Sequence, residues 1–295
     1  MLSSLNWAAQ QLKDPQGRAL AASIRWLALD LPGKLTDLEW PVAVVGQGKP
    51  ILMLHGFDSS FLEFRRLAPL LASSHQLWIP DLCGFGFSPR PPGAAYGPQL
   101  VLSHLKALLP LIQAANQFEK IGLIGASMGG AVALQLAMAL EQSNPQLVDK
   151  MLLLAPAGIT GKARPLPAPF NKFGVAFLGL PAVRRGLCRQ AFADPKASVG
   201  PAEEEIASLH LKTPGWAESL ATFASSGGFA GVDGALPSCE LQVLWGANDR
   251  ILPAAQRQAA AARLGNNCCT ELKSCGHLPH LDQPTLVASH WRQSR

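Results

Sequence analysis

The chain has 295 residues, of which 48% are hydrophobic and 15% charged, and its 25 basic and 20 acidic residues give a formal net charge of +5. This length and apolar content can bury a large core and suit one α/β domain that carries an insertion. No run of Lys and Arg exceeds two residues, which argues against a phosphate-binding stripe and a nucleic-acid partner.

The cysteines and the N-terminus bear on the compartment. Six cysteines have irregular spacing and form no Cys-x-x-Cys motif, which favours reduced thiols and a cytoplasmic location. The first 29 residues lack the pattern of a signal peptide, so residues 1–40 are predicted to be an N-terminal extension with a leading helix on the domain surface. An organelle-targeting role for this extension stays open.

Short apolar runs alternate with helical segments along the chain. The predicted strands are 42–45, 51–54, 77–79, 121–124, 151–154, 241–244 and 269–272. The predicted helices are 63–72, 98–116, 131–141, 254–264 and 285–292. Most strand runs are continuous rather than alternating, as in strands that are buried on both faces of a mostly parallel sheet. Strands and helices in this order predict an α/β fold with right-handed crossovers.

One charge-free run, residues 121–140, is long enough to span a bilayer. Four glycines fall within its first ten positions, so it is predicted to divide into a buried strand and a helix, and no transmembrane segment is expected. The division falls at Gly125-Ala126-Ser127-Met128-Gly129. An abrupt turn from strand to helix strains the turn residue and projects its side chain above the sheet edge. Ser127 is therefore the candidate nucleophile.

The alternation stops between residues 160 and 237. This segment is rich in Pro, Gly and Ala, contains no convincing strand and is far too long for a simple loop. It is either a helical cap over the site or a disordered insertion, and its aromatic side chains favour the packed cap. These side chains are Phe170, Phe173, Phe177, Trp216, Phe223 and Phe229.

A serine nucleophile needs a base, and the base needs an orienting acid. Asp249 follows the predicted strand 241–244, and His277 follows the last predicted strand, 269–272. Because the carboxyl ends of parallel strands lie at one edge of a sheet, Ser127, Asp249 and His277 are predicted to meet there as a catalytic triad.

Other acids and histidines receive structural interpretations. His280 is interpreted as a structural or lid contact, and Asp282 as a helix N-cap. Asp194 or Asp233 would replace Asp249 only if the strand assignment were wrong.

Acyl transfer also needs backbone N–H groups that bind the oxyanion of the tetrahedral intermediate. One donor is predicted to be the amide of Met128, directly after the candidate nucleophile. The other is predicted to be the amide of Phe57, in the His55-Gly56-Phe57-Asp58 loop after strand 51–54. The Phe57 side chain is expected to line the acyl pocket, and His55 to brace the loop.

Five motifs in chain order resemble those of the α/β-hydrolase superfamily over roughly residues 42–291. They are His55-Gly56-Phe57, residues 81–88, residues 125–130, Trp245-Gly246-Ala247-Asn248-Asp249 and residues 276–280. Residues 55–64 resemble a cyanobacterial and plastid branch of hydrolases. The motifs are also similar to those of small-molecule esterases, meta-cleavage-product carbon–carbon hydrolases and cofactor-free haloperoxidases.

The resemblance implies an eight-stranded, mostly parallel sheet with a helical cap inserted after the sixth strand. The core would comprise residues 41–159 and 238–295, and the cap residues 160–237. Having Ser127 instead of an aspartate argues against haloalkane dehalogenase and epoxide hydrolase chemistry, and residues 81–88 are interpreted as a structural loop.

The leading functional hypothesis is a serine hydrolase of the carboxylic-ester class that cleaves an ester or related acyl bond of a small, largely apolar molecule. A carbon–carbon bond hydrolase and a non-catalytic ligand-binding protein on the same scaffold are the alternatives. No cofactor is expected: Gly84-Phe85-Gly86 lacks the third glycine of a dinucleotide fingerprint, and His277 and His280 have no metal-ligand company. Acyl-chain preference and oligomeric state are left open by the sequence.

Overall fold

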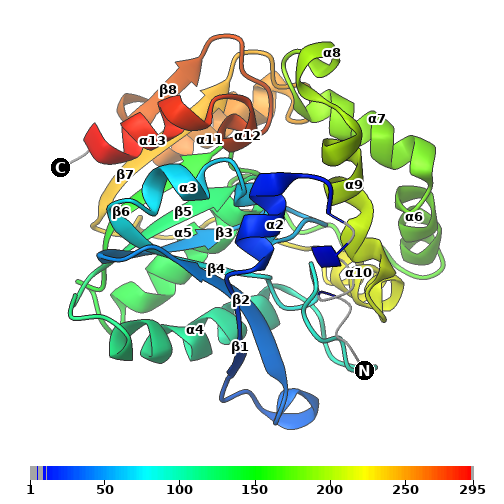
Figure 1. Cartoon of the computed structure of the whole chain (residues 1–295), viewed down its shortest axis with the longest axis horizontal. Coiled ribbons are helices and arrows are strands. Elements are labelled where there is room, and N and C mark those ends of the chain that lie inside the picture. Colours follow the sequence, from blue (N-terminus) through cyan, green and yellow to red (C-terminus); the bar gives the residue numbers. More distant parts are fainter. Residues whose placement is uncertain (1–4, 6–8, 11, 294–295) are drawn as a thin grey trace.

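The computed structural model describes Leu5, Ala9, Gln10 and residues 12–293, and an eight-stranded sheet runs through its centre (Figure 1). The strands are β1 Ile24–Ala28, β2 Glu39–Val45, β3 Lys49–Leu54, β4 His75–Pro80, β5 Ile121–Ala126, β6 Val148–Leu154, β7 Glu240–Gly246 and β8 Cys269–Leu272. They lie in the order β1-β2-β4-β3-β5-β6-β7-β8, with β2 antiparallel to both neighbours and every other pairing parallel. The predicted fold class and all seven predicted strands are confirmed.

Helices cover both faces of the sheet, which explains why the central strands read as continuous apolar runs. All six residues of β5 are buried. One face packs against α4 (Pro98–Ala114), α5 (Met128–Glu141) and α11 (Ala254–Leu264). The other packs against α2 (Pro15–Ala21), α3 (Ala68–Leu71) and α13 (Pro284–Gln293). The shorter helices are η1 Gly33–Leu35, η2 Phe61–Phe64, η4 Asn266–Cys268 and α12 Pro279–Asp282.

Residues 160–237, which we call the helical insertion, lie between β6 and β7 and along one side of the molecule (Figure 1). Their helices are α6 Phe170–Leu178, α7 Pro181–Ala191, α8 Pro195–Ser198, α9 Pro201–Leu209, η3 His210–Lys212 and α10 Trp216–Ser225. Val175, Leu220 and Phe223 of these helices are buried in the core. The insertion therefore forms a packed helical layer, and the disordered alternative is wrong.

Two local predictions need correction. Strand β1 lies inside the segment predicted to be only an extension; all five of its residues stay partly or fully exposed, so the apolar signal was weak. The predicted helix 63–72 is interrupted, because Pro69 fits only the first turn of a helix and α3 begins at Ala68. The leading-helix prediction for residues 1–40 falls partly outside the described residues, and within them α2 forms.

The charge-free run 121–140 divides at Ser127 into β5 and α5, as predicted. Among the described residues, none of the helices combines the length and apolarity needed to cross a membrane.

Candidate active site

Ser127 occupies a strained turn between β5 and α5. Its backbone angles are φ 51° and ψ −120°, which a residue with a Cβ rarely adopts. The backbone is held there by its N–H, which donates to the Leu154 carbonyl at 2.8 Å, and by its carbonyl, which accepts from the amides of Gly130 and Ala157. Gly129 permits the close approach of β3, since a Cβ at this position would lie 2.0 Å from the Leu54 carbonyl oxygen.

His277 joins Ser127 to Asp249. The Ser127 hydroxyl lies 2.9 Å from His277 Nε2, and His277 Nδ1 lies 2.9 Å from Asp249 Oδ2. These contacts fit one tautomer, in which Nδ1–H donates to the carboxylate and Nε2 accepts the serine proton. The structure thus brings the three predicted side chains into one hydrogen-bonded chain at the carboxyl ends of β5, β7 and β8.

Asp249 is held as a carboxylate. Its Oδ1 accepts the amides of Ile251 and Leu252 at 2.8 and 3.0 Å, which leaves Oδ2 for His277. Burial alone would raise the pKa of Asp249, but these hydrogen bonds and His277 outweigh it and hold the pKa below its ordinary value. Asp194, the alternative acid, instead caps α8 through the amides of Lys196 and Ala197.

The loop after β3 lies against the nucleophile. A Cβ built at Gly56 would be 3.3 Å from the Cβ of Ser127, so Phe57 follows directly on a residue in contact with the serine. Phe57 and Met128 line the same cavity. Met128 is also the first residue of α5, whose N-terminus carries partial positive charge that favours an anion.

His55 braces this loop, in agreement with its interpretation. Its Nε2 accepts the amide of Leu82 at 3.0 Å, so Nδ1 is protonated and donates to the Gly56 carbonyl at 2.8 Å. Burial lowers the pKa of His55 to about 4, which keeps the ring neutral. The neighbouring Asp81 accepts the amides of Phe61 and Phe87, and residues 81–88 thereby hold the same loop.

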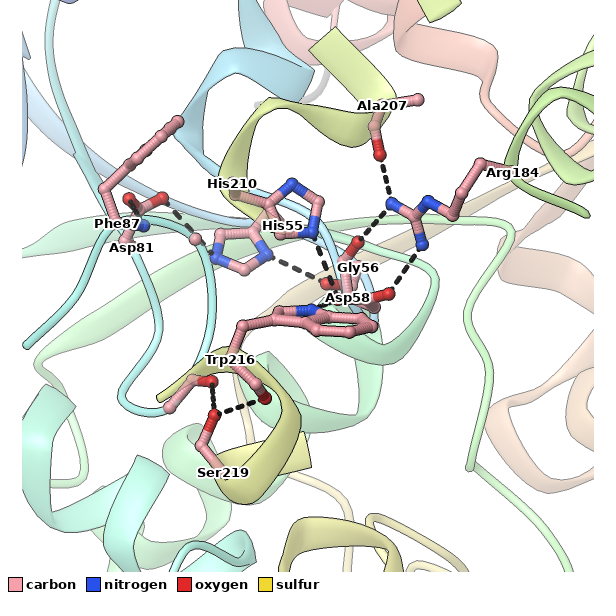
Figure 2. A network of polar contacts seen from close by, with 12 residues as sticks. His55, Gly56, Asp58, Asp81, Phe87, Arg184, Ala207, His210, Trp216 and Ser219 are labelled. Atoms are coloured by element: carbon pink, nitrogen blue, oxygen red, sulfur yellow. Dashed lines mark hydrogen bonds and ion pairs between the residues drawn. The ribbon is translucent and has the colours of Figure 1, made fainter. Parts of the chain in front are cut away.

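Asp58, which follows Phe57, attaches the loop to the insertion (Figure 2). Its carboxylate accepts hydrogen bonds from Arg184 of α7 at 2.6 Å, from Trp216 of α10 at 2.8 Å and from His210 of η3 at 3.1 Å. Burial would raise the pKa of Asp58, but His210, Arg184 and Trp216 together lower it. Sequence reasoning missed this buried cluster.

The insertion also contacts the loop of His277. The His277 amide donates to the Ala191 carbonyl at 2.7 Å. Asp282 accepts the amides of Gly276 at 2.7 Å and Ala193 at 2.9 Å, so its interpretation as a helix N-cap is wrong. His280 is fully buried, and its Nε2 lies 3.0 Å from Glu63 Oε1. This buried contact fits the structural interpretation of His280.

A cavity of about 330 Å³ opens beside this site. Its wall is mainly apolar, and Arg164 is the single charged residue among its lining side chains. The lining is Phe57, Met128, Ala157, Gly158, Arg164, Leu166, Phe223, Ala224, Gly227, Gly228 and Phe229. Phe57 packs against Phe85 and Phe223 with ring centroids 5.9 and 6.1 Å apart. In the part of the chain that the structure describes, no three His, Cys, Asp or Glu side chains form a metal-binding group.

The sequence pattern of the alpha/beta hydrolase family matches residues 51–290, and the chain belongs to this family. It is an α/β-fold hydrolase.

Two proteins and one solved structure illustrate what the chain is similar to. The chain is 29% identical to the alpha/beta hydrolase domain-containing protein VTE7 of Arabidopsis thaliana, over 94% of this chain and 85% of that protein. It is 28% identical to a 2-hydroxymuconate semialdehyde hydrolase of Pseudomonas sp. strain CF600, over 83% of this chain and 86% of the relative. The solved 2-hydroxy-6-oxo-6-phenylhexa-2,4-dienoate hydrolase of Rhodococcus sp. strain RHA1 superposes with a TM-score of 0.69 at 24% identity, over 91% of this chain and 99% of that chain.

Proposed function

We propose that this hydrolase is a serine hydrolase of the carboxylic-ester class, which cleaves an ester or related acyl bond of a small, largely apolar molecule. The observation that carries the proposal is the position of the His277 ring, with one nitrogen at the Ser127 hydroxyl and the other at Asp249. A hydrogen-bonded chain of hydroxyl, imidazole and carboxylate is the arrangement that activates a serine.

The reaction would proceed through an acyl-enzyme. Ser127 Oγ attacks the carbonyl carbon while His277 Nε2 takes its proton, and the protonated ring then donates that proton to the leaving alcohol. Water, deprotonated by His277, attacks the acyl group and releases the acid and free Ser127. Asp249 stabilises the imidazolium, and the amides of Phe57 and Met128 donate to the oxyanion, each contributing roughly 3–4 kcal/mol.

The lining of the cavity supports the proposal of an apolar acyl group in the substrate. Three phenylalanines, Phe57, Phe223 and Phe229, line it together with Leu166 and Met128. A pocket with few polar groups binds mainly by removing apolar surface from water. The insertion supplies much of this wall, which supports the role of residues 160–237 as a cap. The six free thiols support a reducing compartment such as the cytoplasm.

A fluorophosphonate probe tests the nucleophile. Wild-type protein is expected to incorporate one probe molecule and to lose hydrolysis of a p-nitrophenyl ester in parallel. Ser127→Ala is expected to resist labelling, and Ser73→Ala, at an exposed turn, is expected to label as the wild type does. Folded wild-type protein that stays unlabelled would contradict the proposal and would favour a non-catalytic binding protein.

Carbon–carbon bond hydrolysis is the second candidate, and two observations favour it. Relatives at 28% and 25% identity are hydrolases of 2-hydroxymuconate semialdehyde and 2-hydroxy-6-oxo-2,4-heptadienoate. Arg164 also lines the cavity, where it offers a cation to a substrate carboxylate.

Turnover of a dienoate ring-fission product, compared with that of a p-nitrophenyl ester, separates the two activities. Arg164→Gln provides a second criterion. The variant should lose dienoate turnover and keep ester turnover if the arginine binds a carboxylate. Higher kcat/KM for the dienoate in the wild type would replace the ester assignment.

A further inference from the structure

Large apolar side chains are exposed together on the insertion. Among the described residues, nine such side chains keep more than a third of their surface exposed, and six of them lie between residues 166 and 187. Phe170, Phe173 and Phe177 of α6 are 63%, 67% and 59% exposed. Their spacing places them on one face of the helix. We call these three phenylalanines with Leu166 and Leu180 the α6 patch. Large apolar side chains that are exposed together on one segment mark a candidate interaction site.

The opposite face of α6 is fixed to the protein. Val175 is buried. The side-chain Nδ2 of the buried Asn171 donates to Ser225 Oγ at 2.8 Å and to the Ala221 carbonyl at 3.3 Å, and both of these residues lie on α10. Figure 1 shows α6 at the outer edge of the insertion, away from the sheet. The phenylalanines therefore face outward because the helix is anchored by its other side.

The segment that carries the patch has charges of one sign. Residues 160–193 contain six Lys and Arg residues and no Asp or Glu. Arg184 pairs with Asp58 and Arg189 with Glu204. Lys162, Lys172 and Arg185 are exposed and have no carboxylate partner among residues 12–293.

Because residues 160–193 carry both the exposed phenylalanines and exposed cations without a carboxylate partner, we propose that the α6 patch docks on the surface of an anionic lipid bilayer. The apolar face would enter the boundary between headgroups and acyl chains, and the cations would contact anionic headgroups. A second copy of this chain is a poorer occupant, because a two-fold contact through the patch would bring like charges together.

The patch adjoins the cavity beside Ser127. Leu166 belongs to both, and a Cβ at Gly174 of α6 would lie 3.7 Å from its Cδ2. A docked molecule could therefore take an acyl chain from the bilayer into the cavity with little exposure to water. This delivery step rests on the proposed hydrolase function, whereas docking itself does not.

Vesicle flotation with the full chain tests docking. The wild type is expected to float with vesicles of phosphatidylcholine and phosphatidylglycerol and to bind phosphatidylcholine vesicles more weakly. The triple variant Phe170→Ser, Phe173→Ser, Phe177→Ser is expected to bind about tenfold more weakly or worse. A matched variant, Phe118→Ser with Leu286→Ser, removes exposed apolar side chains elsewhere and should bind as the wild type does.

Reversing the charges in Lys162→Glu, Lys172→Glu, Arg185→Glu should abolish the preference for anionic vesicles. Wild-type protein that floats with neither vesicle, or a triple serine variant that binds undiminished, would overturn the proposal. A wild-type dimer that the serine substitutions convert to a monomer, without vesicle binding, would assign the patch to self-association instead.

Activity and docking are measured separately. Ser127→Ala should bind vesicles as the wild type does, and the triple serine variant should keep its turnover of a soluble short-chain ester. Wild-type protein that turns over the ester but does not bind vesicles would contradict docking alone. Wild-type protein that binds vesicles but does not turn over the ester would contradict the hydrolase assignment alone.

Discussion

Asp58 Oδ2 lies 2.6 Å from Nη1 of Arg184, and this buried ion pair ties the residue next to Phe57 to helix α7 of the insertion. Trp216 and His210 reach the same carboxylate from α10 and η3. Because Asp58 has a φ of 48°, its backbone conformation costs free energy and persists only when its surroundings hold it. The insertion therefore shapes the loop that carries one of the proposed oxyanion donors.

Arg184→Met should show this coupling. The variant leaves the Asp58 carboxylate buried without its strongest partner, and breaking a buried pair costs about 3–5 kcal/mol. We expect a lower Tm and a lower kcat on a p-nitrophenyl ester. Arg185→Met, at the exposed neighbouring position, is the control and should change neither quantity. Equal Tm and kcat for the two variants would show that the Asp58 pair does not hold the loop.

Asp249→Asn separates chemistry from folding. An amide cannot stabilise the imidazolium of His277 or fix its tautomer as the carboxylate does, so kcat is expected to fall about 10³–10⁴-fold. The amide oxygen can still accept from Ile251 and Leu252, so Tm should change little. Asp233→Asn, at an exposed loop position, is the control for kcat. A kcat within tenfold of wild type would remove Asp249 from the proposed triad.

The site illustrates what a single sequence can predict. Ser127, Asp249 and His277 each follow an apolar run that proved to be a parallel strand, and the ends of parallel strands share one edge of the sheet. Local pattern and topology were sufficient to bring these residues together. The same apolar runs and their alternation with helical segments predict the fold class, the strand positions and the helix after Ser127.

The contacts made by the insertion could not be predicted in this way. Asp58 meets Arg184 and Trp216 across more than a hundred residues, and no period in the sequence encodes such a pairing. The role of Asp282 also depends on the insertion, because its carboxylate accepts the amide of Ala193, 89 residues away, together with that of the nearby Gly276. Strand β1 was missed because it lies at the sheet edge, where residues remain partly exposed.

Gly246 is predicted to be indispensable to the geometry of the site. A Cβ there would lie 1.9 Å from the carbonyl oxygen of Gly276, so alanine must push β7 away from the loop that carries His277. We expect Gly246→Ala to lower Tm and to reduce kcat by separating Asp249 from His277. Gly186→Ala is the matched control: a Cβ there meets nothing within 4 Å, and alanine favours the helix by roughly 0.5–1 kcal/mol. Gly246→Ala with wild-type Tm and kcat would contradict this prediction.

His104 predicts how stability depends on pH. His104 is fully buried, and the centroid of its ring lies 4.5 Å from the ring centroid of Trp40. Neither ring nitrogen of His104 has a hydrogen-bond partner within the described residues. Burial lowers the pKa of His104 to about 3. The unfolded chain therefore takes up this proton below about pH 6.5 while the folded protein does not, and stability is lost progressively as the pH falls from about 6.5 towards 3.

His104→Leu removes that titration and fills a similar volume with an apolar side chain. The free energy of unfolding of the variant minus that of the wild type does not contain the contributions of the other titrating groups, because these are the same in both proteins. This difference should grow in favour of the variant by about 1.4 kcal/mol per pH unit below pH 6.5. Urea unfolding of both proteins at several pH values between 7 and about 4.5 measures this difference in unfolding free energy. A difference that stays constant over this range would mean that His104 is already protonated in the folded protein, or that the unfolded chain does not titrate it.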